Sequence, residues 1–121
     1  MARILVIDDS PTETGQLVGV LKGQGHELLT ALTGSEGIEL AMSEQPDLIL
    51  MDVVMPGING FQATRQLTRD GATSHIPVII VSSKSLASDR IWGERQGAVA
   101  YLVKPVDERV LIAAVNEALR P

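Results

Sequence analysis

The sequence predicts an α/β protein built on an open, doubly wound parallel sheet, and three observations support this. Five short apolar runs rich in β-branched residues recur along the 121 residues. The runs lack strict alternation of polar and apolar residues, which is typical of strands covered on both faces. Helical patterns follow each run, and five strand–helix units favour a parallel sheet with helices on both sides. Five units are too few for a closed eight-stranded barrel.

The elements can be placed in order along the chain. The predicted strands are Arg3–Ile7, Leu28–Ala31, Asp47–Met51, Val78–Val81 and Val99–Val103. We expect the first helix to begin after Ser10, because Ser10 suits an N-cap, Pro11 suits the first turn and Glu13 would complete a capping box. Ser35 is the expected cap of the second helix. The later helices are predicted at Phe61–Asp70, Ser88–Gln96 and Asp107–Leu119.

Composition narrows the class of protein. The length suits one domain, and we expect a single domain over residues 1–121 with no output domain. The absence of cysteine excludes a disulfide scaffold, a thiolate metal site and a cysteine nucleophile. A net charge of −5 argues against a nucleic-acid-binding surface. No apolar run is long enough to cross a membrane, so a soluble cytoplasmic protein without membrane insertion is expected.

Side chains that could bind an ion or take part in a reaction follow four of the five predicted strands. They are Asp8 and Asp9 after the first strand, Asp52 after the third, Ser82 after the fourth and Lys104 after the fifth. A single acidic residue after a strand is commonly a solvated loop residue or a helix cap. Functional groups of doubly wound sheets, however, gather at the carboxyl ends of the strands. We therefore expect these five side chains to lie close together at the carboxyl ends of the strands, a region that we call the mouth.

The chemistry of such a mouth can be inferred from its charges. Three neighbouring carboxylates repel one another, and a divalent cation relieves that repulsion. Hard oxygen ligands favour Mg²⁺ or Mn²⁺, and Mg²⁺ commonly pairs with phosphate. Lys104 could neutralise a phosphoryl oxygen, and Ser82 could donate a hydrogen bond to another. A carboxylate nucleophile in this setting indicates phosphoryl transfer onto aspartate.

Four segments give the chain a family resemblance: "VIDDS", "LILMDVVMPGINGF", "PVIIVSS" and "AYLVKP". Over essentially its whole length, the chain resembles a response-regulator receiver domain of the CheY-like kind. The resemblance implies the CheY-like, flavodoxin-like (βα)5 fold with strand order 2-1-3-4-5. It also implies a role in two-component signal transduction, as a phosphorylation-controlled switch that catalyses only its own phosphoryl transfer and autodephosphorylation.

The resemblance further implies which residues hold the phosphoryl group and the metal. Asp52 would be the phosphoacceptor, and a CheA-like histidine kinase would be the donor. Asp9 and Asp52 would bind Mg²⁺ or Mn²⁺, with the backbone carbonyl of Val54 as a third ligand and Asp8 acting through water. Many receivers carry a polar side chain where this chain has Val54, and that departure leaves the lifetime of the phosphorylated state open.

Other positions would sense the phosphoryl group. Ser82 and Lys104 would contact it, and the peptide bond from Lys104 to Pro105 is expected to be cis, which proline makes accessible. Tyr101 would be the aromatic switch that moves inward as Ser82 moves toward the phosphoryl group.

The segment "DRIWGERQGA", Asp89–Ala98, resembles the fourth helix of receivers from twitching-motility, type IV pilus systems of the PilH kind. This implies chemotaxis-like control of pilus motility and an effector related to the pilus motor. Trp92 within it could contact a partner, but packing over the fourth helix and its neighbour is the favoured interpretation. We expect a monomer.

Three alternatives compete with a partner-binding switch. A stand-alone receiver could instead act as a phosphate sink that drains a shared kinase. A haloacid-dehalogenase-type phosphatase would need a second acid two residues after Asp52, where Val54 stands. A flavodoxin-like FMN binder would need a hydroxyl- and glycine-rich loop after the first strand, where Asp8 and Asp9 would repel the phosphate.

Overall fold

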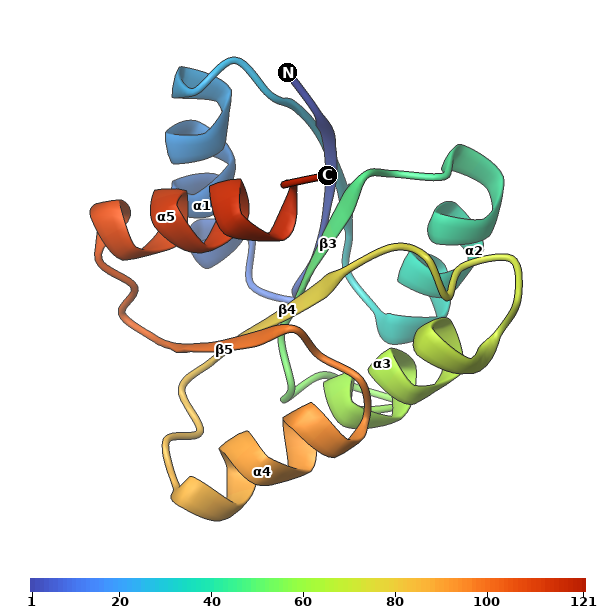
Figure 1. The fold of residues 1–121 in the computed structure, drawn as a ribbon. Helices are drawn as coiled ribbons and strands as arrows, with labels where there is room; N and C mark the ends of the chain where they lie inside the picture. Colours follow the sequence, from blue (N-terminus) through green and yellow to red (C-terminus); the bar gives the residue numbers. More distant parts are fainter.

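The computed structural model describes residues 1–121, and strands alternate with helices along the whole chain (Figure 1). In order, the elements are β1 (Arg3–Ile7), α1 (Pro11–Gly23), β2 (Glu27–Ala31), α2 (Gly34–Glu44), β3 (Leu48–Met51), α3 (Gly60–Arg69), β4 (Val78–Ser82), α4 (Ala87–Arg95), β5 (Ala100–Val103) and α5 (Glu108–Ala118). The five strands and the last three helices match the predicted ranges to within one residue at each end. None of the helices combines the length and the hydrophobicity that a bilayer crossing requires.

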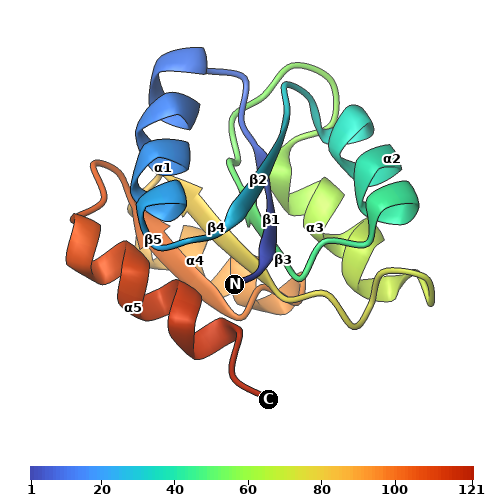
Figure 2. The ribbon, with the colours of Figure 1, turned by 90° about the horizontal axis from the view of Figure 1, so that it is seen from above.

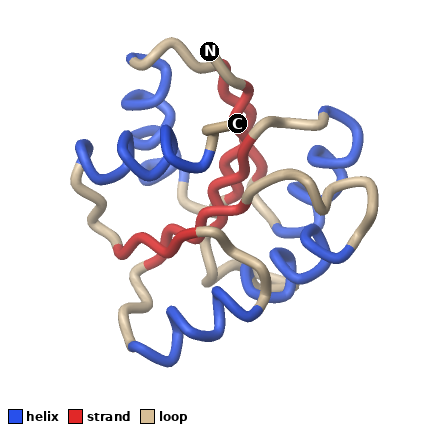
Figure 3. Tube along the Cα trace, in the orientation of Figure 1, coloured by secondary structure: helices blue, strands red, loops and turns tan.

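The strands form one parallel sheet in the order β2-β1-β3-β4-β5, as expected. The sheet is the central layer, with helices on both sides (Figure 3). Helices α1 and α5 cover one face, and α2, α3 and α4 cover the other (Figure 2). The chain reverses its direction of winding between β1 and β3. The carboxyl ends of these two neighbouring strands therefore flank the crevice where a doubly wound sheet places its site.

Two apolar clusters, one on each face of the sheet, hold these layers together. Alternate residues of a strand enter opposite clusters: in β1, Leu5 and Ile7 face the α2–α3–α4 side, whereas Ile4 and Val6 face the α1–α5 side. All four side chains are fully buried. Burial on both faces explains why the apolar runs lack alternation in the sequence.

The cap of α1 differs from the predicted capping box. The Ser10 hydroxyl accepts a hydrogen bond from the Glu13 N–H at 3.4 Å, so Ser10 is the N-cap as expected. The reciprocal half is absent, because the Ser10 N–H donates to the Asp8 carboxylate at 2.9 Å. The Glu13 carboxylate instead accepts a hydrogen bond from the ammonium of Lys104, which lies 91 residues later in the sequence.

The starts of α2 and α3 show how local hydrogen bonding sets helix ends. Ser35 is not the cap of α2; the Thr33 hydroxyl accepts from the Glu36 N–H at 3.1 Å and starts the helix earlier. At α3, Asn59 and Gln62 form a complete capping box, with both hydrogen bonds at 2.9 Å. This cap fixes the beginning of α3 beside the loop that leaves β3.

Candidate functional site

The site begins where β1 and β3 end side by side. Ile7 and Met51, the last residues of these strands, are paired in the sheet register. The next residue of each strand is still tied to the sheet: the Asp52 N–H donates to the Ile7 carbonyl at 2.9 Å, and the Asp8 N–H donates to Ala31 at 3.0 Å. The sheet backbone therefore sets the positions of both aspartates.

Asp8, Asp9 and Asp52 form an acidic cluster in which one carboxylate oxygen of each lies within 4.8 Å of the others. Asp8 and Asp52 are buried, whereas Asp9 is exposed at the rim. Burial raises the pKa of Asp52 to about 6, since the lowering effect of Lys104 is only partial and Asp8 adds a further raising effect. The raised pKa means that the groups around Asp52 do not fully offset the cost of burying its negative charge.

The donor set of this cluster fits a magnesium ion. Three carboxylates supply hard oxygen ligands, and the spacing of their oxygens allows one small ion to contact more than one of them. The exposed position of Asp9 leaves one side open to water, which Mg²⁺ retains in most protein sites. Val54 lies in the loop after β3 and is 62% exposed, and the role of its carbonyl stays a prediction.

Lys104 supplies the positive charge of the mouth. Its ammonium lies 2.8 Å from an Asp8 oxygen, 2.6 Å from a Glu13 oxygen and 3.5 Å from an Asp52 oxygen. Burial disfavours its charged form, but the hydrogen bonds that it donates to Asp8 and Glu13 and the charge of Asp52 raise the pKa of Lys104 above the ordinary value. The peptide bond from Lys104 to Pro105 is cis, as expected. Lys104 is therefore a permanent cation within reach of the predicted phosphoacceptor.

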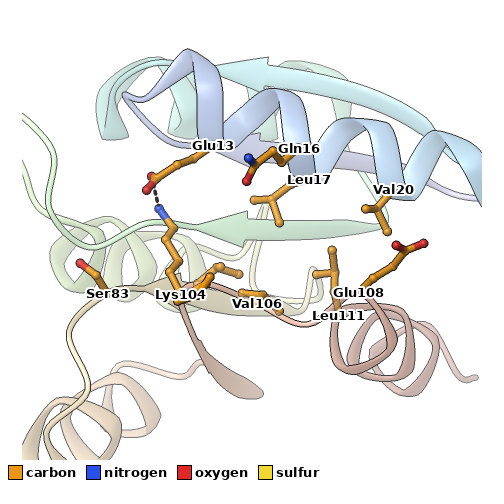
Figure 4. Close-up of a pocket in the computed structure, with 11 residues that line it drawn as sticks. Glu13, Gln16, Leu17, Val20, Ser83, Lys104, Val106, Glu108 and Leu111 are labelled. Carbon is orange, nitrogen blue, oxygen red and sulfur yellow. Dashed lines mark hydrogen bonds and ion pairs between the residues drawn. The ribbon is translucent and has the colours of Figure 1, made fainter.

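Glu13 is the member of the site that the sequence did not reveal. It lies in the first turn of α1, and Figure 4 shows its carboxylate directed at the Lys104 ammonium. Residues 13 and 104 are brought together only by the packing of α1 against the segment between β5 and α5. A glutamate three residues after a serine also fits a helix cap, so its sequence context indicated a different role.

Ser82 and Tyr101 both hold one residue, Lys84, in the loop between β4 and α4. The buried Ser82 hydroxyl accepts from the Lys84 N–H at 3.2 Å. The Tyr101 hydroxyl donates to the Lys84 carbonyl at 2.7 Å, and its ring is buried. Burial raises the pKa of Tyr101 above its ordinary value. The two residues expected to act as the switch thus hold the backbone N–H and the backbone carbonyl of the same loop residue.

The first turn of α3 lies directly against the backbone of Asp52. A Cβ at Gly60 would overlap the Asp52 carbonyl group, so glycine is required at this position. The Gly60 N–H donates to the Val53 carbonyl at 2.9 Å, which closes the loop. At the turn itself, Gly57 has φ +76°, a conformation that favours glycine. These contacts fix the path of the loop that carries Val54.

Helix α4 packs against Tyr101 on one side and is open to solvent on the other. Gly93 lies so close to Ile80 and Tyr101 that an added Cβ would crowd both side chains. The neighbouring Trp92 is 48% exposed and lines a shallow pocket between α3 and α4 together with Phe61. Trp92 thus covers part of this junction while about half of it remains open to solvent, and its role stays a prediction.

Comparison with known proteins agrees with this geometry. The sequence model of the response regulator receiver domain matches residues 4–116, and the chain belongs to this family. The family signals by phosphorylation. A phosphatase of the haloacid dehalogenase kind is not favoured, because Val54 stands where its second acid would be needed.

Individual relatives and solved structures resemble the chain over most of its length. The chain is 57% identical to Protein PilH of Pseudomonas aeruginosa over 119 residues, which is 98% of each chain. It is 40% identical to the response regulator PleD of Caulobacter vibrioides, of which it spans only 26%. Among solved structures, a putative response regulator from Chloroflexus aurantiacus has a TM-score of 0.94 at 30% identity, covering 98% of this chain and 97% of the other. The chemotaxis protein CheY4 of Vibrio cholerae has a TM-score of 0.91 at 27% identity, covering 98% and 99%.

Proposed function

We propose that this protein is a response regulator that accepts a phosphoryl group on Asp52 from the phosphohistidine of a CheA-like histidine kinase. The observation that carries the proposal is a buried carboxylate at the end of β3, with two further aspartates and Lys104 within reach. An Asp52 oxygen forms the new bond to phosphorus. The bond from phosphorus to the histidine nitrogen breaks, and its electron pair returns to the imidazole.

Each residue of the mouth then has a role in this transfer. Asp9 and Asp52, with the carbonyl of Val54, would hold Mg²⁺, and Asp8 would act on it through water. The bound ion supplies positive charge that offsets the charge of the incoming phosphoryl group. Lys104 is 3.5 Å from Asp52 and stays protonated, so it pairs with a phosphoryl oxygen. The protein turns over no substrate beyond its own phosphoryl group.

The signal leaves the site through Ser82 and Tyr101. The Ser82 hydroxyl turns toward the phosphoryl group and gives up its hydrogen bond from Lys84. Ser82 and Tyr101 both bind the backbone of Lys84, one at its N–H and the other at its carbonyl, so a change at one of them alters the support of the other. Tyr101 also contacts α4 through Gly93. Phosphorylation therefore repacks α4, β5 and α5 and changes a protein-binding surface.

The biological setting is proposed from similarity to PilH. The 57% identity over 98% of both chains supports chemotaxis-like control of type IV pilus twitching motility. The protein acts in the cytoplasm as a monomer and docks an effector related to the pilus motor. The second candidate is a phosphate sink that drains the shared kinase, and it needs the same phosphorylation site.

The first test is phosphorylation with acetyl phosphate and with a candidate kinase. Intact-mass spectrometry is expected to show one phosphoryl adduct in the presence of Mg²⁺, and Asp52→Asn is expected to abolish it. Asp9→Ala is expected to remove the dependence on Mg²⁺ together with most of the adduct. A Mg²⁺-dependent adduct that persists in Asp52→Asn would contradict the assignment of the site.

A second experiment separates the switch from the sink. Beryllofluoride with Mg²⁺ forms a stable substitute for the phosphoryl group, and we expect it to change the fluorescence of Trp92. The activated protein should then retain a specific effector in a pull-down, whereas Asp52→Asn treated in the same way should not. Fast phosphotransfer without any effector, together with faster loss of phosphate from the kinase, would favour the sink.

A further inference from the structure

Glu13 occupies a position that the proposed transfer leaves unexplained. Its carboxylate is 2.6 Å from the Lys104 ammonium, a shorter contact than those of Asp8 at 2.8 Å and Asp52 at 3.5 Å. The three acids differ in exposure: the side chain of Glu13 is 47% exposed, whereas those of Asp8 and Asp52 are 2% and 9% exposed. Glu13 is thus the only partner of Lys104 that can leave for solvent without moving the sheet.

The ammonium of Lys104 has a limited capacity for partners. A lysine ammonium has three N–H donors. Two of them are used by Asp8 and Glu13, and the remaining contact, with Asp52, is long for a hydrogen bond. A phosphoryl oxygen on Asp52 needs one donor with good geometry. The third donor is free, but the contacts with Asp8 and Glu13 hold the ammonium 3.5 Å from Asp52. The contact with Glu13 therefore opposes the closer approach to Asp52 that a phosphoryl oxygen requires.

We propose that Glu13 is a positioning residue that holds Lys104 away from the phosphoryl group and restrains phosphorylation until its carboxylate moves aside. This inference rests on the proposed function. Glu13 acts through Lys104 and does not touch the reacting atoms. Its negative charge also repels an anionic phosphodonor, and this second effect likewise slows phosphorylation.

The groove beside Glu13 shows where the carboxylate can go. A groove of about 500 Å³ runs between α1 and the segment from Lys104 to α5, with Glu13 at one end (Figure 4). Its floor is apolar and includes Leu17 and Val106, and its rim includes Gln16. A rotation of the Glu13 side chain toward Gln16 or solvent would release Lys104 without displacing the backbone.

A purely structural role for Glu13 predicts the opposite result. An acid in the first turn stabilises a helix through its dipole, so Glu13→Gln would lower the thermal stability slightly and would leave ligand binding unchanged or weaker. Competition for Lys104 predicts tighter binding of a phosphoryl substitute in the same variant. The two roles are therefore separated by the direction of the change in affinity.

The test is calorimetric titration of the Mg²⁺-loaded protein with beryllofluoride, supported by the rate of phosphorylation by acetyl phosphate. We expect Glu13→Gln to bind beryllofluoride about two- to fivefold more tightly than the wild type, the size expected when a half-exposed ion pair is removed. Glu13→Asp, whose shorter side chain cannot maintain the contact, should also bind more tightly. The matched control is Glu108→Gln, because Glu108 is a first-turn acid lining the same groove without contacting Lys104, and it should match the wild type.

The outcomes distinguish this inference from the proposed function. Equal or weaker binding in Glu13→Gln, alongside normal binding by the wild type, would overturn the role of Glu13 and leave the phosphorylation site intact. An equal gain in Glu108→Gln would also overturn it, since the effect would then be one of general charge. A wild type that binds no beryllofluoride in the presence of Mg²⁺ would overturn both.

Discussion

Asp52 combines two properties that oppose each other at neutral pH. The proposed transfer requires an ionised Asp52, yet burial and the neighbouring Asp8 raise its pKa to about 6. The folded chain therefore holds a carboxylate whose charge is poorly solvated until a cation or a phosphoryl group arrives. Under the proposed function, this burial lowers the stability of the free state in exchange for reactivity.

This residue gives a prediction about stability and pH. With Mg²⁺ removed by EDTA, Asp52→Asn should be more stable than the wild type at pH 7 by about 0.5–2 kcal/mol. Because the pKa is higher in the folded chain, the stabilising contribution of Asp52 is present below its ordinary value of 3.8 and is lost as the pH rises through about 6. Urea unfolding across this range should show the gap between the two proteins widening with pH. A gap that is constant with pH would contradict the raised pKa.

At the scale of elements, the glycines of α1 and α2 have opposite surroundings. Gly15 and Gly19 lie within α1, and an added Cβ would meet no atom within 4 Å. Gly37 lies in α2, and a Cβ there would overlap the side chain of Ile7 in the core. Gly15 and Gly19 therefore weaken α1 without being required by packing, whereas Gly37 allows α2 to approach the sheet.

We expect Gly15→Ala and Gly19→Ala each to raise the free energy of unfolding by about 0.5–1 kcal/mol, because alanine restricts the unfolded chain and favours the helix. Gly37→Ala is the control from the same class of substitution and should lower stability, since the Ile7 side chain must move. Chemical denaturation of the three variants measures both directions. Destabilisation by the α1 substitutions would show that α1 is more tightly packed than its contacts indicate.

The elements also show what the sequence could predict. The strands could be located to within one residue, because burial on both faces leaves long apolar runs with sharp polar ends. Asp8, Asp52 and Lys104 could be assigned to one mouth, because parallel strands place their carboxyl ends together. The contact of Glu13 with Lys104 could not be predicted, since it depends on how closely α1 approaches the chain after β5. The cap of α2 at Thr33 was missed because Ser35 is an equally good capping residue in the sequence.

At the scale of the whole molecule, ligand binding and folding should be coupled. The site draws on loops after β1, β3, β4 and β5, so it exists only in the folded chain. Beryllofluoride with Mg²⁺ at about 100 times its dissociation constant should raise the free energy of unfolding by ~2.7 kcal/mol. Thermal unfolding with and without the ligand measures this effect. Asp52→Asn should show almost none of it, and an equal shift in that variant would indicate binding elsewhere.

The two ends of the chain meet at the end of the sheet opposite to the proposed phosphorylation site. One shallow pocket is lined both by Met1 and Ala2 and by Ala118, Leu119 and Arg120. His26, which precedes β2, lines the same pocket and accepts a hydrogen bond from the Ala2 N–H at 3.1 Å. Attaching the protein to a sensor surface through either end would therefore leave the mouth facing the solution. A short flexible linker could also join the ends, and new ends could then be opened at an exposed loop.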